Sequence, residues 1–173
     1  MFWLAKQQVS SEYARVNAGK TLDHPISLDY VRRYAGLDLE QRLRSYCTSG
    51  VYVWGSKPER AHQTVKIGDL NTLFLFRQGT VINKIGVAIT KHESEALANC
   101  LWGRDADGET WSTIHFFGGL EPKSVPYQRI CRALKTSPAD NWQGLSVVPL
   151  DDTEKARVFF RRLLPEAARQ GQQ

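Results

Sequence analysis

Two tryptophans flank a polar turn in the stretch LANCLWGRDADGETWSTIHFF, residues 97–117. Trp102 precedes the turn and Trp111 follows it. Aromatic faces hold flat ligands well, because stacking of a nucleic-acid base on a ring contributes roughly 1–3 kcal/mol. The alternative is that a ring fills the core. Trp111 lies inside an apolar strand pattern, which favours the core, whereas the position of Trp102 at the edge of the loop is compatible with either the core or a ligand pocket.

Histidines are the commonest general bases, and their surroundings in the sequence contain no catalytic motif. No G-x-S-x-G nucleophile motif is present. His92-Glu93 lacks the second histidine of a zinc-protease helix. The four candidate bases are His24, His62, His92 and His115.

The acidic residues of the turn resemble the start of a calcium loop. Asp105, Asp107 and Glu109 have the right spacing, but the glycine and glutamate required later in an EF-hand are missing. A metal-dependent nuclease would need several carboxylates and a lysine around its ion, and no clear set is present. We therefore predict no catalytic residue, no metal site and no cofactor.

Composition describes an ordinary globular chain with a modest basic bias. The 173 residues are 42% hydrophobic and 24% charged, which fits one domain with its own core. The net charge of +5 and the pI of about 9.2 are compatible with a polyanionic partner.

Cysteine usage and hydropathy predict a cytoplasmic protein without a membrane partner. Cys47, Cys100 and Cys131 are not spaced like metal ligands or a redox pair, so we expect buried, reduced thiols. The amino terminus has neither the basic region nor the apolar region of a signal peptide. No apolar stretch approaches the roughly 18 residues of a membrane span.

Helix caps and strand alternation predict the order of elements. Ser27 and Gly36 bound a helix over 26–36, and Asp38 with Gln41 forms a capping box for a second helix over 38–50. A hairpin turns at Gln78-Gly79. Further strands are expected at 51–56, 109–120 and 144–150, and further helices at 92–102, 125–138 and 153–170.

The elements predict an α+β fold rather than a doubly wound parallel sheet, because strands and helices do not alternate regularly. A small twisted β-barrel with helices packed around it fits the short strands best. We expect an N-terminal helical extension over 1–50, a barrel domain over 51–165 and a frayed tail over 166–173.

A pocket for one base needs aromatic walls, hydrogen-bonding groups for the base edge and basic residues for the phosphates. A methylated base suits such walls, because its methyl group lies against ring surface without losing a polar contact. Proteins that inspect single bases often flip them out of the duplex. Trp54, Ser56 and Trp102 are the candidate base-binding residues.

The order of motifs from Val51 to Ile130 resembles the YTH/EVE branch of the PUA-like superfamily. It is most similar to the amino-terminal recognition domains of McrB-type and related modification-dependent restriction systems. The motifs that carry the resemblance are Ser56, Gly68-Asp69, Gly86-Val87-Ala88, Trp102, the strand Trp111–Phe116 and Val125-Pro126-Tyr127.

This resemblance implies a twisted, barrel-like sheet that flips a modified base into an aromatic cage. By position, Trp102 resembles a cage tryptophan and Ser56 resembles the polar residue beside the base, with Trp54 as a second wall. YTH proteins carry another cage tryptophan after the first strand, and the short segment KPERAHQTVKI has none. The identity of the modification therefore stays open.

Basic residues near the expected pocket entrance are candidates for phosphate contact. Lys57, Arg60 and Lys66 follow the strand that ends at Ser56. A solvated surface is the alternative for each of them.

The leading hypothesis is a non-catalytic reader of a methylated or hydroxymethylated base in double-stranded DNA. It would serve a restriction or defence system, with any nuclease or NTPase on a partner chain. The alternatives are a reader of modified RNA with the same fold, an enzyme that processes nucleic acid, and a protein-interaction domain that binds its partner through the arginine-rich amino-terminal helices.

Overall fold

The computed structural model describes residues 3–150, except 138, 140, 141 and 143. The strands of this part are β1 (Trp3–Gln8), β2 (Tyr52–Ser56), β3 (Thr72–Gln78), β4 (Val81–Glu93), β5 (Thr113–Phe117), β6 (Glu121–Pro126) and β7 (Leu145–Pro149). Its helices are α1 (Glu12–Thr21), α2 (Leu28–Ala35), α3 (Leu37–Arg44), α4 (Ala61–Thr64), α5 (Glu95–Trp102) and α6 (Tyr127–Ala133), with a 3-10 turn η1 (Pro58–Arg60).

One mixed sheet contains all seven of these strands. The path runs β2-β5-β4-β3-β1-β7, and β6 pairs with β4 beside it. All pairs are antiparallel except β1 with β3, which is parallel. The prediction of an α+β fold is confirmed. Since β2 and β7 end the path and do not pair with each other in the described residues, the closed barrel remains a prediction.

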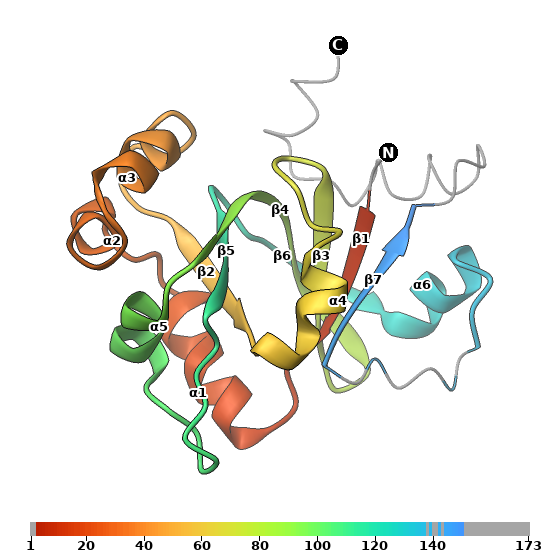
Figure 1. Ribbon diagram of the computed structural model, residues 1–173. Helices are drawn as coiled ribbons and strands as arrows, with labels where there is room; N and C mark the ends of the chain where they lie inside the picture. The colour runs from red at the N-terminus through yellow and green to blue at the C-terminus, as the bar shows by residue number, and fades with distance from the viewer. Residues whose placement is uncertain (1–2, 138, 140–141, 143, 151–173) are drawn as a thin grey trace.

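The first strand lies inside the sheet, between β3 and β7 (Figure 1). Leu4 and Ala5 are fully buried there. This differs from the predicted helical extension over 1–50, of which only α1, α2 and α3 are helical. The four middle residues of β1 are all buried, so both faces of the strand are covered and its sequence WLAKQQ does not show the simple alternation of a half-exposed strand.

Local capping signals placed α2 correctly and α3 incorrectly. The hydroxyl of Ser27 accepts a hydrogen bond from the amide of Tyr30, and α2 ends at Gly36, where φ is +97°. Because that same Gly36 also starts the next helix, α3 begins at Leu37, and the capping box predicted at Asp38 is wrong. The helix also ends at Arg44, before Gly50.

The hairpin predicted around Gln78-Gly79 is confirmed. Strands β3 and β4 meet there, and Gly79 has a φ of +60°, a conformation that favours glycine. The strand β6, which the sequence did not predict, pairs with β4 immediately before α6. The predicted helix over 153–170 and tail over 166–173 lie outside the described residues.

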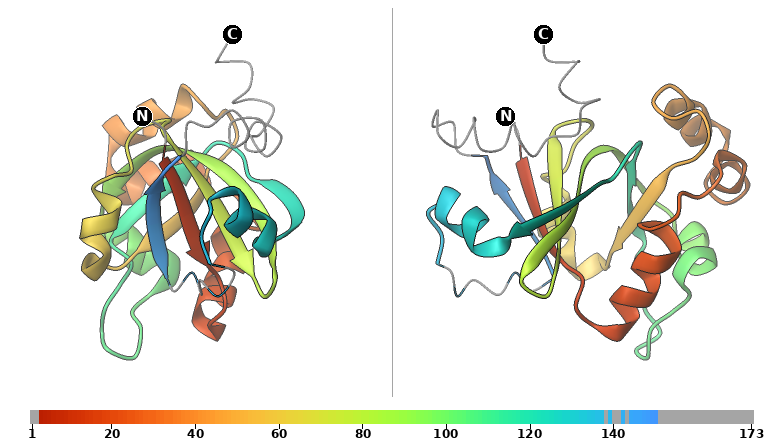
Figure 2. Two further views of the ribbon diagram at one scale, coloured as in Figure 1. Left: turned by 90° about the vertical axis from the view of Figure 1, so that its right-hand side faces the viewer. Right: turned by 180° about the vertical axis from the view of Figure 1, so that it is seen from behind.

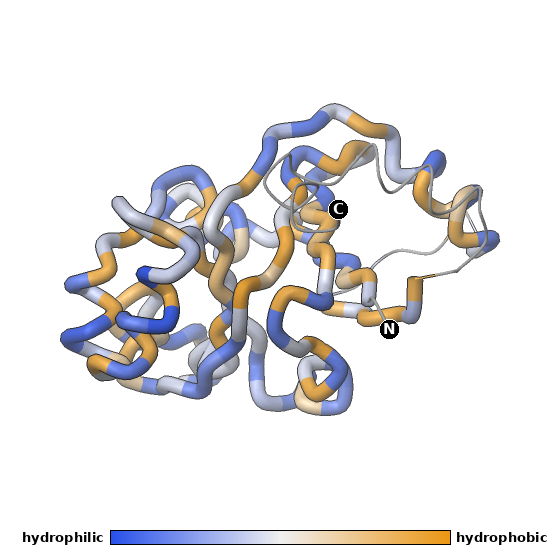
Figure 3. The backbone as a smooth tube through the Cα atoms, turned by 90° about the horizontal axis from the view of Figure 1, so that it is seen from above, coloured by the Kyte–Doolittle hydropathy of each residue, from blue (hydrophilic) through white to orange (hydrophobic). Residues whose placement is uncertain are grey.

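Buried side chains form three clusters on the two sides of the sheet. One packs α2, α3 and α5 against β2 and β5, and another packs α6 against β1, β3 and β4. The third lies between α1 and the middle strands. Figure 2 shows α2, α3 and α5 at one end of the sheet and α6 at the other, and Figure 3 shows hydrophobic and hydrophilic segments interspersed along the backbone. None of the helices described here has the length and apolar character needed to cross a membrane.

Candidate nucleic-acid interface

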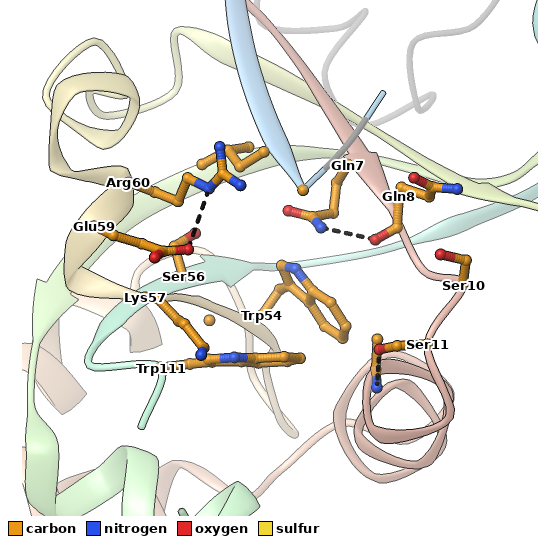
Figure 4. A pocket seen from close by; sticks show the side chains of 14 residues that line it. Gln7, Gln8, Ser10, Ser11, Trp54, Ser56, Lys57, Glu59, Arg60 and Trp111 are labelled. Carbon is orange, nitrogen blue, oxygen red and sulfur yellow. Dashed lines mark hydrogen bonds and ion pairs between the residues drawn. The ribbon is translucent and has the colours of Figure 1, made fainter. Parts of the chain in front are cut away.

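A cavity of about 450 Å³ opens where the ends of several strands meet (Figure 4). Its volume lies within the range of about 300–1,000 Å³ that is usual for small-ligand sites. It is lined by Gln7 and Gln8 of β1, Ser10, Ser11 and Ala14 at the start of α1, Trp54, Gly55 and Ser56 of β2, Lys57, Glu59 and Arg60, and Trp111, Gly144 and Leu145.

Two tryptophan rings form the aromatic wall of this cavity. The centroids of Trp54 and Trp111 are 4.8 Å apart, with planes inclined at 55°. Trp54 is only 1% exposed and backs the cavity, whereas Trp111 is half-buried and offers accessible ring surface. Tyr13 packs edge-on against Trp111 with centroids 5.2 Å apart. These contacts hold Trp111 in place before any ligand arrives, which reduces the entropy lost on binding.

Gly55 lets two indoles approach the same point of β2. A Cβ atom built there would lie 2.5 Å from the ring of Trp102 and 2.5 Å from the Cβ of Trp111. Both distances are far below ordinary contact, and neither neighbour is the flexible end of a side chain. A larger residue at position 55 would therefore displace the aromatic wall.

The structure places Trp102 and Trp111 the opposite way round from the expectation. Trp102 is 4% exposed, lies in the hydrophobic core and is not among the residues that line the cavity. Its indole nitrogen donates to the Thr21 hydroxyl at 3.2 Å. Trp111 instead lines the cavity, because it lies just before β5 rather than inside it. Helix α1 covers Trp102 through contacts of Thr21 and Tyr13.

Ser56 occupies the predicted position beside the aromatic wall, and it is paired with a buried histidine. Its Oγ lies 3.1 Å from Nε2 of His115, which is fully buried. Burial lowers the pKa of His115 from 6.5 to about 3, with a smaller contribution from the positive charge of Lys91. The imidazole is therefore neutral at physiological pH and cannot supply positive charge to a ligand.

Lys57 lines the cavity, but carboxylates already bind its ammonium group. Its Nζ lies 2.5 Å from Oδ2 of Asp105 and 3.0 Å from Oε2 of Glu109. These hydrogen bonds raise the pKa of Lys57 and lower the pKa of Asp105. The polar turn between the two tryptophans thus reaches across the edge of the cavity and neutralises its lysine.

The other two predicted phosphate contacts differ in position. Arg60 lines the cavity and lies 3.7 Å from the carboxylate of Glu59. Lys66 is not a lining residue, and its Nζ donates to the Gln63 side chain and to the Val147 carbonyl, both at 3.4 Å. The structure therefore brings Trp54, Ser56, Lys57 and Arg60 to one cavity, and places Trp102 and Lys66 elsewhere.

No pattern in the sequence indicated that β1 and β7 contribute to the cavity. Gln7 and Gln8 reach the cavity because β1 is inserted between β3 and β7, which pairs residues far apart in the chain. Gly55 lies inside the strand pattern VYVWGS. A glycine inside a strand often marks a place where another group packs closely against the backbone, and this is the signal that could have indicated the approach of the two tryptophans.

A second cavity has a different character. Its volume is about 550 Å³, and it lies beside α2, α3 and β4. No tryptophan, tyrosine or phenylalanine of the described residues lines it. In the described part of the chain, no group of three or more histidine, cysteine, aspartate or glutamate residues is arranged to hold a metal ion. The first cavity is therefore the candidate site for a flat ligand.

Comparisons with known proteins identify the fold. No protein-family model and no curated protein matches the chain. Among solved structures, it is similar to the N-terminal domain of Thermococcus gammatolerans McrB bound to m5C DNA. The TM-score is 0.70 at 17% sequence identity, and the match covers 94% of this chain and 99% of that one. The chain therefore has the fold of this McrB N-terminal domain, as the motif order predicted.

Proposed function

We propose that this chain is a non-catalytic domain that recognises a methylated or hydroxymethylated base in double-stranded DNA. The observation that carries the proposal is the cavity of about 450 Å³ walled by Trp54 and Trp111. It is wide enough for a flipped base and has polar side chains on its other sides. The shared fold with a McrB domain that was solved bound to m5C DNA supports DNA as the ligand and 5-methylcytosine as the first base to test.

Trp111 supplies the ring surface on which the base stacks, and Trp54 closes the back of the pocket. Lys57 and Arg60 contact the phosphates beside the flipped nucleotide. For Lys57 this requires that a phosphate displaces Asp105 and Glu109, which bind its ammonium group in the free protein. Trp102 supports the wall from inside the core, and Lys66 has no proposed ligand contact.

The net charge of +5 favours any polyanion, so it does not distinguish a modified duplex from an unmodified one. We therefore propose that specificity comes from the pocket and not from the surface charge. Such a reader fits a cytoplasmic restriction or defence system in which a nuclease or NTPase acts on a partner chain.

The test is a binding titration with matched duplexes that differ at one base. The duplexes carry cytosine, adenine, 5-methylcytosine, 5-hydroxymethylcytosine or N6-methyladenine at that position. We expect one modified base to bind at least about tenfold more tightly than its unmodified form, a difference of about 1.4 kcal/mol. Equal affinity for all five duplexes would contradict the proposal, and tighter binding of modified single-stranded RNA would assign the pocket to RNA instead.

A further inference from the structure

Two polar side chains of the pocket are each anchored on one side by the protein and turned toward the cavity on the other. Gln7 comes from β1 and Ser56 from β2, and both are largely buried. A buried, oriented polar group in a ligand pocket recognises hydrogen-bonding partners specifically, because a wrong partner leaves that group unpaired.

Gln7 offers an acceptor. Its Nε2 donates to the backbone carbonyl of Gln8 at 2.9 Å, which fixes the orientation of the amide. The carbonyl oxygen Oε1 then points into the cavity, toward the side where Arg60 and Ser56 lie (Figure 4).

Ser56 offers a donor, because of the tautomer that His115 adopts. Nδ1 of His115 is buried and has no partner among the described residues. A hydrogen on Nδ1 would leave a buried N–H unpaired, whereas a hydrogen on Nε2 can be donated to Ser56 Oγ at 3.1 Å. With its oxygen accepting that bond, the Ser56 hydroxyl keeps its own hydrogen for the cavity.

This acceptor and donor match one class of base edge when the exocyclic group of the base faces Gln7 and its ring nitrogen faces Ser56, which is the orientation inferred here. Cytosine and adenine each present an amino group next to an unprotonated ring nitrogen, which supply a donor and an acceptor. Thymine, uracil and guanine present a carbonyl next to a ring N–H at the same positions, which reverses both roles. Flipped bases are commonly read along this Watson–Crick edge.

We propose that Gln7 and Ser56 read the Watson–Crick edge of the flipped base and select bases with an amino group beside an unprotonated ring nitrogen, with His115 as a positioning residue for the Ser56 hydroxyl. This inference rests on the proposed function. It adds that the pocket discriminates between bases with the same methyl group.

The experiment compares 5-methylcytosine with thymine, which carries the same 5-methyl group on the opposite edge pattern. Both bases are placed opposite an abasic site, so that flipping breaks no base pair in either duplex. Duplexes with cytosine and uracil at the same position measure the effect of the methyl group alone. We expect wild-type protein to prefer 5-methylcytosine over thymine by about tenfold.

Variants then assign the preference to residues. Gln7→Leu and Ser56→Ala are each expected to bring the affinities for 5-methylcytosine and thymine close to equality. Gln41→Leu, the same replacement at an exposed position of α3, should keep the wild-type preference. His115→Phe should reduce the preference, and should add nothing further to Ser56→Ala in the double variant. Thermal unfolding of each variant checks its fold, and Gln7→Leu and Ser56→Ala suffice if His115→Phe does not fold.

Two outcomes overturn the inference in different ways. Equal binding of 5-methylcytosine and thymine, with both tighter than cytosine and uracil, would mean that the methyl group is read and the edge is not. That result leaves the proposed function intact. If no modified base binds more tightly than its unmodified form, the proposed function is wrong, and so is the inference that the pocket reads the base edge.

Discussion

Trp102 and Trp111 stand at opposite ends of one loop and touch each other, with centroids 5.6 Å apart, yet only one of them reaches the cavity. Helix α1 covers Trp102, whose indole nitrogen is bound by Thr21, while Tyr13 reaches both tryptophans. Trp111 keeps part of its ring surface accessible. The contrast teaches that the availability of an aromatic ring depends on what packs over it, and not on its distance from a polar loop.

The strongest test of this contrast is Trp102→Ala. Removing a buried indole leaves a cavity, and we expect the free energy of unfolding to fall by about 3–5 kcal/mol. Urea denaturation measures the loss, with Trp102→Phe as the control that keeps most of the volume. A fully stable Trp102→Ala protein that no longer binds modified DNA would return Trp102 to the role of reader.

The complementary test is Trp111→Ala. Because Trp111 supplies the accessible ring surface, we expect affinity for the modified duplex to fall by roughly 1–3 kcal/mol, or about 5- to 150-fold. Trp111→Phe, which keeps a ring, should lose much less. Titration of both variants with the preferred duplex makes the comparison, and unchanged affinity in Trp111→Ala would show that the base stacks elsewhere.

The pH dependence of stability tests the link between the interior and the pocket, because the buried His115 is hydrogen-bonded to Ser56, which lines the pocket. Its pKa is about 3 in the folded chain and 6.5 in the unfolded chain, so only the unfolded chain takes up a proton between these values. The contribution of neutral His115 to the free energy of unfolding is complete above pH 6.5. As the pH falls below that value, this contribution is lost by at most about 1.4 kcal/mol per pH unit.

Urea denaturation between pH 7 and pH 5 checks this dependence. Most carboxylates titrate below that window, with ordinary pKa values of roughly 4. Wild-type stability should fall across the window and the stability of His115→Phe should stay nearly constant. Parallel slopes for the two proteins would indicate that His115 is protonated in the folded state.

The smallest expected effect concerns the loop between the tryptophans. Asp105→Asn with Glu109→Gln leaves Lys57 without its carboxylate partners, and we expect binding to unmodified DNA to strengthen at low salt. Lys57→Met should lower the slope of log affinity against log salt concentration by about 0.9, the value for one phosphate contact. Salt titrations of the three proteins measure both effects, and identical slopes would remove Lys57 from the phosphate contacts.

Local signals in the sequence predicted the parts of the fold that depend on neighbouring residues. The Ser27 cap and the turn at Gly79 involve residues close in the chain, so their positions followed from residue type. The motif order also predicted the fold shared with the McrB domain. In the candidate site, Trp54 and Ser56 were placed beside the cavity for the same reason, since they end one strand.

Long-range packing decided the features that the sequence did not predict. The exposure of Trp111 depends on which helix covers its neighbour, and the position of Gln7 depends on pairing with strands that begin at residues 72 and 145. The carboxylate partners of Lys57, Asp105 and Glu109, are about 50 residues away in the sequence, so the segment that contains Lys57 did not indicate that its charge is neutralised.

The insertion of β1 between β3 and β7 has a consequence for the order of assembly. This strand precedes the other six in the chain, but it pairs with residues 72–77 on one side and 145–149 on the other. Contacts of such sequence separation form late, because the intervening chain must be closed first. The pocket, which takes Gln7 from this strand, is thus completed only when nearly all of the described chain has been synthesised. Chains that lack β7 cannot present it, so the proposed DNA binding depends on residues from both β1 and β7.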